Sequence, residues 1–184
     1  MMRDLSMHVL DIAQNSIKAG ASLVQITFAI DGESWMVISV KDNGCGMSEA
    51  FLAKVTDPFT TTRSTRRVGL GIPMLQQSAE LSGGKLQIDS TQGIGTTLTA
   101  SFHLAHIDCL PLGEMCDTLF SLVFLNPEGL DFVFEATSPG QSASFDTRKV
   151  REVVGEIALN EPEIAQWIKE SIEEEFKPIL EVCG

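Results

Sequence analysis

The sequence predicts an α+β fold, organised as a two-layer α/β sandwich with helices over a mainly antiparallel sheet. Residues 22–30 and 34–42 alternate apolar and polar side chains, as half-buried strands do, and the Asp-Gly pair between them favours a hairpin. Residues 85–90 and 96–104 predict a second hairpin. Helical patterns precede the first hairpin and separate it from the second, so helices and strands should occupy separate layers.

Three helices are expected in this part of the chain. The first covers about residues 5–19 and ends at Gly20, because a residue without a Cβ suits a helix C-terminus. A short second helix should begin after Ser48, whose hydroxyl can cap it. The third follows the segment GLGIPM and stops at Gly83-Gly84.

A domain boundary is expected near residue 105, where AHIDCLPLGEM contains proline and glycine but no periodicity. Residues 1–104 then form one domain, and residues 105–184 form a small α+β C-terminal domain of unknown role. In the second region we expect a helix over 116–125, strands over 130–137 and 142–146, and helices over 147–159 and 161–180. The last two helices are predicted from apolar positions at helical spacing: Val150, Val153, Val154 and Ile157, then Ile164, Trp167, Ile168, Ile172 and Phe176.

The chain has 184 residues and a formal net charge of −12, which is unevenly distributed. The first 104 residues hold eight Lys and Arg against nine Asp and Glu, whereas the remainder holds five against sixteen. Such an acidic region repels phosphate backbones, so nucleic acid is not expected as a partner.

Nothing in the sequence predicts export or membrane insertion. The N-terminus MMRDLSMHVL lacks a basic start followed by a long apolar run, and the stretch SLVQITFAI is too short to cross a bilayer. The four cysteines have neither a disulfide framework nor the CxxC spacing of a zinc site, which favours reduced thiols. We therefore expect a cytoplasmic protein that does not bind a membrane.

An acid, an amide and a base share one face of the first predicted helix. Asp11 and Asn15 are four residues apart, and Lys18 follows three residues later. Side chains at these spacings point the same way from a helix. We take this face as the first part of a candidate site.

The motif DNGCGM provides a second part. Asp42 ends a predicted buried strand, where its carboxylate can accept a hydrogen bond from an exocyclic amine such as that of adenine. Gly44 and Gly46 let the backbone turn tightly and approach a flat ligand. Alone, the motif is more typical of an ordinary loop at the end of a strand, because Asp and Gly are common in turns.

Two further segments suit phosphate. In GLGIPM, Gly69, Leu70 and Gly71 precede a helix, whose free N–H groups and dipole favour an anion. The segment lacks the ending of a P-loop and the third glycine of a dinucleotide fingerprint. In the loop TTTRSTRR, arginines such as Arg63 offer a clamp for polyphosphate, although a run of charges is usually solvated surface.

Taken together and in this order, the motifs resemble the ATP-binding domain of the GHKL superfamily. The resemblance covers residues 4–104. The part NSIKAGAS…VKDNGCGM is most similar to MutL, whereas DPFTTTR…GLGIPM…GIGTTLTASF is similar to bacterial histidine kinases. The resemblance implies the Bergerat ATP-binding fold, with ATP and Mg²⁺ as cofactors.

The resemblance also implies a role for each matching residue. Asn15 matches the asparagine that helps to hold Mg²⁺ on the phosphates, and Asp42 matches the aspartate that binds adenine. The other matches are Gly44, Gly46 and Thr96 at the adenine pocket, Phe59 in the F box, and Lys18, Gly69 and Gly71 at the phosphates, where Arg63 and Leu70 are further candidates.

Asp11 departs from the family pattern at the catalytic position. Gyrase, MutL and anti-sigma serine kinases have glutamate four residues before the asparagine, where it acts as a general base. Water or a hydroxyl needs such a base, whereas an imidazole acceptor does not. An acid here predicts a catalytic role for Asp11, although aspartate is shorter by one methylene. His8, one turn earlier, is expected to be structural or supporting rather than phosphorylated.

These features favour an ATP- and Mg²⁺-binding signalling protein that transfers the γ-phosphate to a partner protein, and a homodimer is possible. The acceptor would be a Ser or Thr hydroxyl, as in anti-sigma kinases, or a His in another chain. Two alternatives stay open. One is a switch that slowly hydrolyses ATP and changes shape. The other is a module that senses ATP without chemistry and docks a protein through its acidic region.

Overall fold

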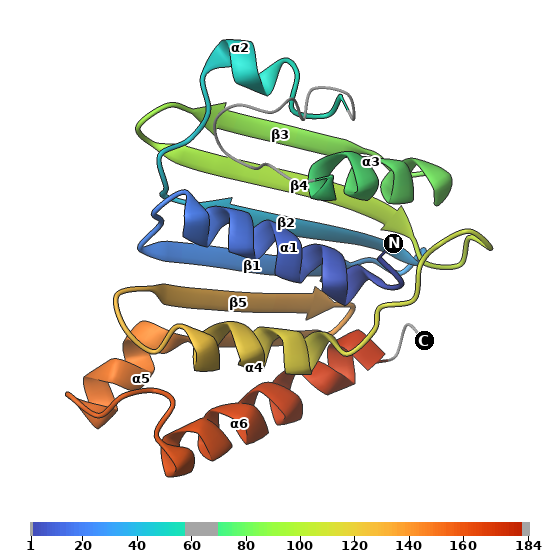
Figure 1. The fold of residues 1–184 in the computed structure, drawn as a ribbon. Coiled ribbons are helices and arrows are strands. Elements are labelled where there is room, and N and C mark those ends of the chain that lie inside the picture. Colours follow the sequence, from blue (N-terminus) through green and yellow to red (C-terminus); the bar gives the residue numbers. More distant parts are fainter. Residues whose placement is uncertain (1, 58–69, 182–184) are drawn as a thin grey trace.

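The computed structural model describes residues 2–57 and 70–181, in which six strands form one sheet with order β3-β4-β2-β1-β5-β6 (Figure 1). Neighbouring strands are antiparallel except β1 and β5, which are parallel. The predicted sandwich of helices over a mainly antiparallel sheet is confirmed. The strands are β1 (Leu23–Ile30), β2 (Trp35–Asp42), β3 (Leu86–Thr91), β4 (Gly95–His103), β5 (Asp131–Ser138) and β6 (Gln141–Asp146).

The larger helices lie in a layer over one face of this sheet. Figure 1 shows α3, α1 and α4 side by side in that order, and α6 packs against α4. Of the described helices, none combines the length and apolarity that crossing a membrane requires. The helices are α1 (Leu5–Lys18), α2 (Glu49–Leu52), α3 (Gly71–Leu81), α4 (Met115–Leu125), α5 (Thr147–Val154) and α6 (Pro162–Leu180).

The predicted ends of the first two helices are confirmed, and each has a local cause. The carboxylate of Asp4 caps α1 by accepting a hydrogen bond of 2.9 Å from the backbone N–H of Met7. Gly20 follows α1 with φ +75°, a conformation that glycine adopts without a Cβ penalty. The side chain of Ser48 caps α2 by accepting a hydrogen bond from the backbone N–H of Phe51.

The first hairpin, formed by β1 and β2, lies beneath α1. Its inward residues, among them Phe28 on β1 and Met36 on β2, are buried in the core, and their neighbours face the other side of the sheet. The register of β2 with β4 places Asp42 opposite Thr96. Two of the predicted site residues therefore meet at one end of the central strands.

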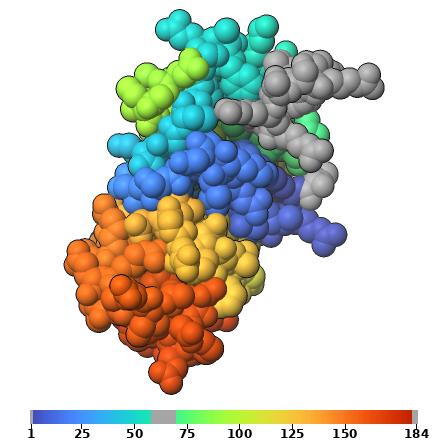
Figure 2. All heavy atoms as spheres, turned by 60° about the vertical axis from the view of Figure 1, so that its left-hand side comes forward, coloured from blue at the N-terminus to red at the C-terminus, as the bar shows by residue number. Residues whose placement is uncertain are grey.

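The region after residue 105 extends the same sheet. β5 pairs with β1, from Leu23 opposite Asp131 onward, and buried residues from both regions belong to one hydrophobic cluster. Figure 2 shows the atoms of the C-terminal helices, in yellow to red, lying directly against those of α1 and β1, in blue. The domain boundary at residues 104/105 therefore stays a prediction, which concerns whether the two regions fold independently.

The segment between β4 and α4 also holds α1. The backbone N–H groups of Leu5 and Ser6, at the start of α1, donate to the carbonyls of Pro111 and Leu112 at 2.9 and 3.0 Å. The first N–H groups of a helix have no partner within the helix, so the linker satisfies two of them. The C-terminal region therefore helps to position the helix that carries Asp11.

Three details of the C-terminal helices differ from the prediction. α5 ends at Val154 instead of continuing to residue 159, because Gly155 adopts φ +66° and breaks the helix. Val153 is 86% exposed, since Val150 and Val154 take the inward positions of this short helix. In α6, Trp167 is about half exposed, whereas Ile168 beside it is buried.

If the two regions unfold as one cooperative unit, a core change in β5 should destabilise both. Phe134 is fully buried and contacts the rings of Phe132 and Phe145. We expect Phe134→Ala to lower the free energy of unfolding by about 3–5 kcal/mol. Guanidinium titrations monitored by fluorescence would measure the loss.

The two tryptophans make this test specific for each region. Trp35 lies on β2, and Trp167 lies on α6. In the background of Trp167→Phe or Trp35→Phe, the remaining tryptophan should report the same midpoint, and Phe134→Ala should shift both. Phe124→Ala, at a partly exposed position on α4, is the control with a smaller loss. Two separate midpoints would contradict a single unit.

Candidate functional site

Within the described residues, three buried atoms on the polar face of α1 have no hydrogen-bond partner. These atoms are Nδ1 of His8, Oδ2 of Asp11 and Nδ2 of Asn15. Buried polar groups are nearly always paired, so unpaired ones usually mark places where a ligand or water binds. Lys18 lies exposed at the C-terminal end of the same helix. The predicted grouping of acid, amide and base on one helix face is therefore present.

The carboxylate of Asp11 lies against the first residue of α3. A Cβ added to Gly71 would overlap Asp11 Oδ2, so the absence of a side chain allows this approach. Burial raises the pKa of Asp11, and the charge of Lys18 partly opposes that effect. With its raised pKa, the Asp11 carboxylate can accept a proton. It also faces the N-terminal end of α3, which favours anions.

Asp42 is held at the end of β2 by two hydrogen bonds. Its Oδ2 accepts a bond of 2.6 Å from the hydroxyl of Ser16 on α1, and its Oδ1 accepts one of 2.9 Å from the N–H of Gly44. Each oxygen keeps a further lone pair for a ligand donor. The carboxylate is therefore fixed in orientation while it can still accept from an amine.

The loop after Asp42 is clamped by the turn between β3 and β4. The N–H of Gly93 donates to the carbonyl of Cys45 at 2.7 Å. Gly46 has φ +64°, and a Cβ there would overlap the carbonyl of Thr91. Only glycine fits this contact, which explains the motif physically. Gly44 is buried against Ala19, at the C-terminal end of α1.

Thr96 is oriented by a serine that sequence reasoning missed. The hydroxyls of Ser90 and Thr96 lie 2.8 Å apart, and Ser90 also accepts a hydrogen bond of 2.8 Å from the N–H of Met47. Ser90 thus connects the β3–β4 hairpin to the loop after Asp42. Ser16 was also missed. Its position next to Asn15 and on the buried face was the available signal.

These contacts define two ends of one site along α1. Asp42 contacts position 16 of the helix, and Gly71 lies against position 11. Five residues of α-helix separate these contacts by about 7.5 Å along the axis. Leu70, beside Gly71, is exposed. Phe59, Arg63 and Gly69 were predicted to belong to the site and lie outside the described residues.

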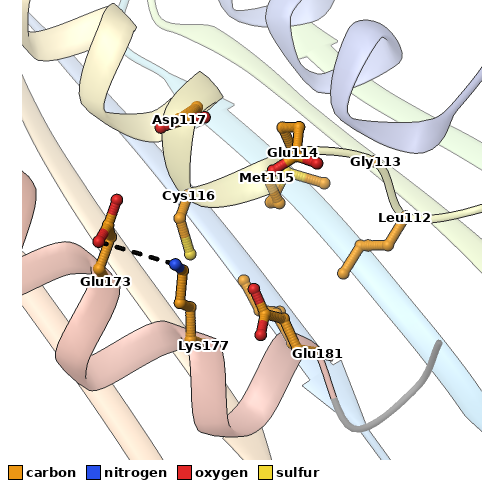
Figure 3. A pocket seen from close by; sticks show the side chains of 10 residues that line it. Leu112, Gly113, Glu114, Met115, Cys116, Asp117, Glu173, Lys177 and Glu181 are labelled. Atoms are coloured by element: carbon orange, nitrogen blue, oxygen red, sulfur yellow. Dashed lines mark ion pairs between the residues drawn. The ribbon is translucent and has the colours of Figure 1, made fainter.

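A second hollow lies between the N-terminal end of α4 and the C-terminal end of α6 (Figure 3). Four of its ten lining residues are acidic, and Lys177 forms an ion pair of 3.7 Å with Glu173. Burial, reinforced by the charge of Glu181, raises the pKa of the Cys116 thiol to about 11. That thiol stays protonated near neutral pH and is a poor nucleophile. None of the predicted site residues that the structure describes lines this hollow.

Comparison with known proteins identifies the family that this chain matches. Residues 3–106 match the family of histidine kinase-, DNA gyrase B- and HSP90-like ATPases. Over 106 residues, 53% of this chain, it is 35% identical to the sensor histidine kinase WalK of Bacillus subtilis, and it spans 17% of that relative. A putative sensor protein of Shewanella frigidimarina is 42% identical over 73 residues, which are 39% of this chain and 11% of the relative.

The fold is also similar to that of a solved structure of the MutL ATPase domain of Aquifex aeolicus in complex with ADP. The TM-score is 0.50 at 16% identity, over 84% of this chain and 70% of that one. The likeness therefore extends past the family match and into the region after residue 106. The chain belongs to the family of histidine kinase-, DNA gyrase B- and HSP90-like ATPases.

Proposed function

We propose that this protein binds ATP with Mg²⁺ and transfers the γ-phosphoryl group to a hydroxyl of a partner protein, as a signalling kinase of the histidine-kinase-like, anti-sigma type. The observation that carries the proposal is the unpaired, half-buried carboxylate of Asp11 against the N-terminal end of α3. A family ATPase domain related to sensor kinases supports the nucleotide and the signalling role.

Each end of the site receives a part of the nucleotide in this proposal. The exocyclic amine of adenine donates to Asp42, which Ser16 orients, and Thr96 lies beside it in the strand register. Asn15 supplies an oxygen ligand to Mg²⁺, which prefers oxygen and shares its shell with phosphates. Lys18 and the start of α3 at Gly71 hold the phosphates.

Residues outside the described ranges complete the proposed phosphate site. Gly69 would continue the backbone cradle before α3, and Arg63 would add a cation to the phosphates. Phe59 keeps the cofactor-binding role that its match to the F box implies. These three assignments rest on the sequence motifs alone.

The proposed step needs a base for its nucleophile. A hydroxyl oxygen of the partner forms the new bond to the γ-phosphorus, the bond to the β–γ bridging oxygen breaks, and ADP leaves. Asp11 accepts the hydroxyl proton. A histidine acceptor would not use this carboxylate, because its imidazole attacks through an existing lone pair. Asp11 therefore supports transfer to a hydroxyl.

Hydrolysis is the second candidate, because the same carboxylate could activate water. The fold likeness to a MutL ATPase domain, whose structure holds ADP, favours it. The protein would then be an ATP-gated switch with slow turnover. Both candidates use Asp11 as the base and differ in where the phosphoryl group goes.

Incubation with γ-labelled ATP, alone and with lysate, separates these candidates. Transfer predicts label on a partner protein, and hydrolysis predicts free phosphate only. Asp11→Asn should reduce either product by at least about 100-fold, since a general base contributes 10²–10⁴-fold. Asp89→Asn, an exposed acid on β3, is the matched control and should react normally. ATP binding without product would favour an ATP-sensing module instead.

Nucleotide affinity should depend on the pair of Ser16 and Asp42. We expect Asp42→Ala to abolish measurable ATP binding in calorimetry. Ser16→Ala should weaken it about tenfold, as expected for one hydrogen bond to a charged group. Asp89→Ala should bind like the unsubstituted protein. Equal affinity in Asp42→Ala would contradict the assigned adenine end.

The raised pKa of Asp11 predicts a stability change with a definite sign. A folded-state pKa above the unfolded value means that the ionised carboxylate destabilises the fold at neutral pH. Asp11→Asn should therefore raise the melting temperature at pH 7. The gain should shrink as the pH falls through the raised pKa toward the unfolded value, because both states then become protonated. A gain that is constant with pH would contradict this cause.

A further inference from the structure

β6 is the last strand at one end of the sheet, and its outer edge has unpaired backbone groups. A two-residue turn, Pro139-Gly140, joins it to β5, so Ser138 and Gln141 exchange backbone hydrogen bonds, as does every second pair after them. The N–H and C=O groups of Ser142 and Ser144 therefore point away from β5. Within the described residues, neither serine has a hydrogen bond outside the ladder with β5, and both are exposed.

Residues 141–145 lack the features that usually protect a sheet edge. Such edges are commonly blunted by charged residues, proline, a bulge or a covering segment. This stretch holds neither a charge nor a proline, and its register with β5 is continuous. The opposite edge, β3, carries Asp89, and the segment around α2 packs against it, where the N–H of Met47 donates to Ser90. The β6 edge is therefore suited to accept another strand.

An exposed tryptophan lies beside this edge. α6 packs on β6, and Ile168 is fully buried on the face of α6 that meets the sheet. Lys169, the next residue, forms an ion pair of 3.6 Å with Asp117 of α4, and Figure 3 shows Lys177 of α6 on the same side. Trp167 precedes Ile168 and so lies on the other side of α6, away from α4 and toward the outer margin of β6. It is about half exposed, and tryptophans of this kind commonly anchor protein interfaces.

The charges around the edge favour a basic occupant. Glu175 follows Trp167 by eight residues, which places it on the same side of α6, and it is exposed. Glu135, opposite Ser144 on β5, is exposed on the face of the sheet that points away from the core. Residues 105–184 hold sixteen acidic against five basic side chains. A second copy of this region would therefore bring like charges together, whereas a segment with Lys or Arg would complement them.

We propose that β6 binds an extended, Lys- or Arg-bearing segment of a partner protein as an additional strand of the sheet. The segment pairs its backbone with the outward groups of Ser142 and Ser144, and an apolar side chain packs on Trp167. The charge of Arg148, at the end of the strand, is balanced by its ion pair of 2.8 Å with Asp146. β6 lies three strands from β2, so this surface is separate from the proposed nucleotide site.

A basic peptide tests this surface without nucleotide. In the Trp35→Phe background, Trp167 is the remaining tryptophan, and its emission should shift to the blue, with saturation, when the synthetic peptide KVTVKV covers it. The peptide EVTVEV should bind at least about tenfold more weakly. N-methylation of two consecutive residues of KVTVKV blocks both of its edges and should abolish binding. Equal binding of all three peptides, or no saturable binding of KVTVKV, would overturn the proposal.

Substitutions on the protein separate strand pairing from general attraction. Ser144→Pro removes an outward N–H at a position where a strand edge tolerates proline, and should weaken binding of KVTVKV at least about tenfold. Ser144→Ala, the matched control, keeps the backbone and should bind normally. Glu175→Lys leaves the strand untouched and should also weaken binding, which keeps the test decisive if the proline variant does not fold. Normal binding in the folded variants of this set would contradict the proposal.

The oligomeric state identifies the occupant. Sedimentation of Ser144→Pro should match that of the unsubstituted protein, and its affinity for ATP should be unchanged. A dimer of the unsubstituted protein that Ser144→Pro dissociates would assign the edge to a second copy and overturn the proposed partner. The peptide measurements involve neither nucleotide nor turnover, so they stand whether or not the proposed kinase reaction occurs.

Discussion

The site depends on how α1 is fixed between the sheet and α3. The hydroxyl of Ser16 donates a 2.6 Å hydrogen bond to Asp42 on β2, and His8 contacts Ser78 on α3. Burying a polar group is costly unless it is paired. Ser16 and the Nε2 atom of His8 are paired where α1 meets β2 and α3, whereas Asp11 Oδ2 and Asn15 Nδ2, between those contacts, have no partner among the described residues. The structure thus gives up stability where a ligand would bind, as functional sites commonly do.

The region after residue 105 braces this helix from the side opposite α3. Its linker carbonyls, from Pro111 and Leu112, accept the first N–H groups of α1, and α4 packs along the helix. β5 lies beside β1 beneath it. A protein that binds the acidic surface of this region would therefore act on elements in direct contact with α1. This continuity connects the acidic region physically to α1.

Local patterns in the sequence could predict local structure and the chemistry that lies on it. The alternating strands, the cap of Ser48 and the face that carries Asp11 and Asn15 are all short-range features. The pairing of β1 with β5 could not be predicted, because parallel strands about one hundred residues apart leave no joint pattern in sequence. Ser90 was missed for the same reason, since its contact with Thr96 arises from strand register.

The short side chain of Asp11 raises the question of whether it can reach a nucleophile. A glutamate would extend one methylene further from α1. Here α3 lies close to Asp11, because Gly71 has no Cβ that would meet the carboxylate. This approach shortens the distance that the Asp11 side chain must span. The N-terminal end of α3, where phosphate would bind, thereby lies directly at the carboxylate. Reach is thus a property of the pair, because a side chain at position 71 would displace the Asp11 carboxylate from this contact.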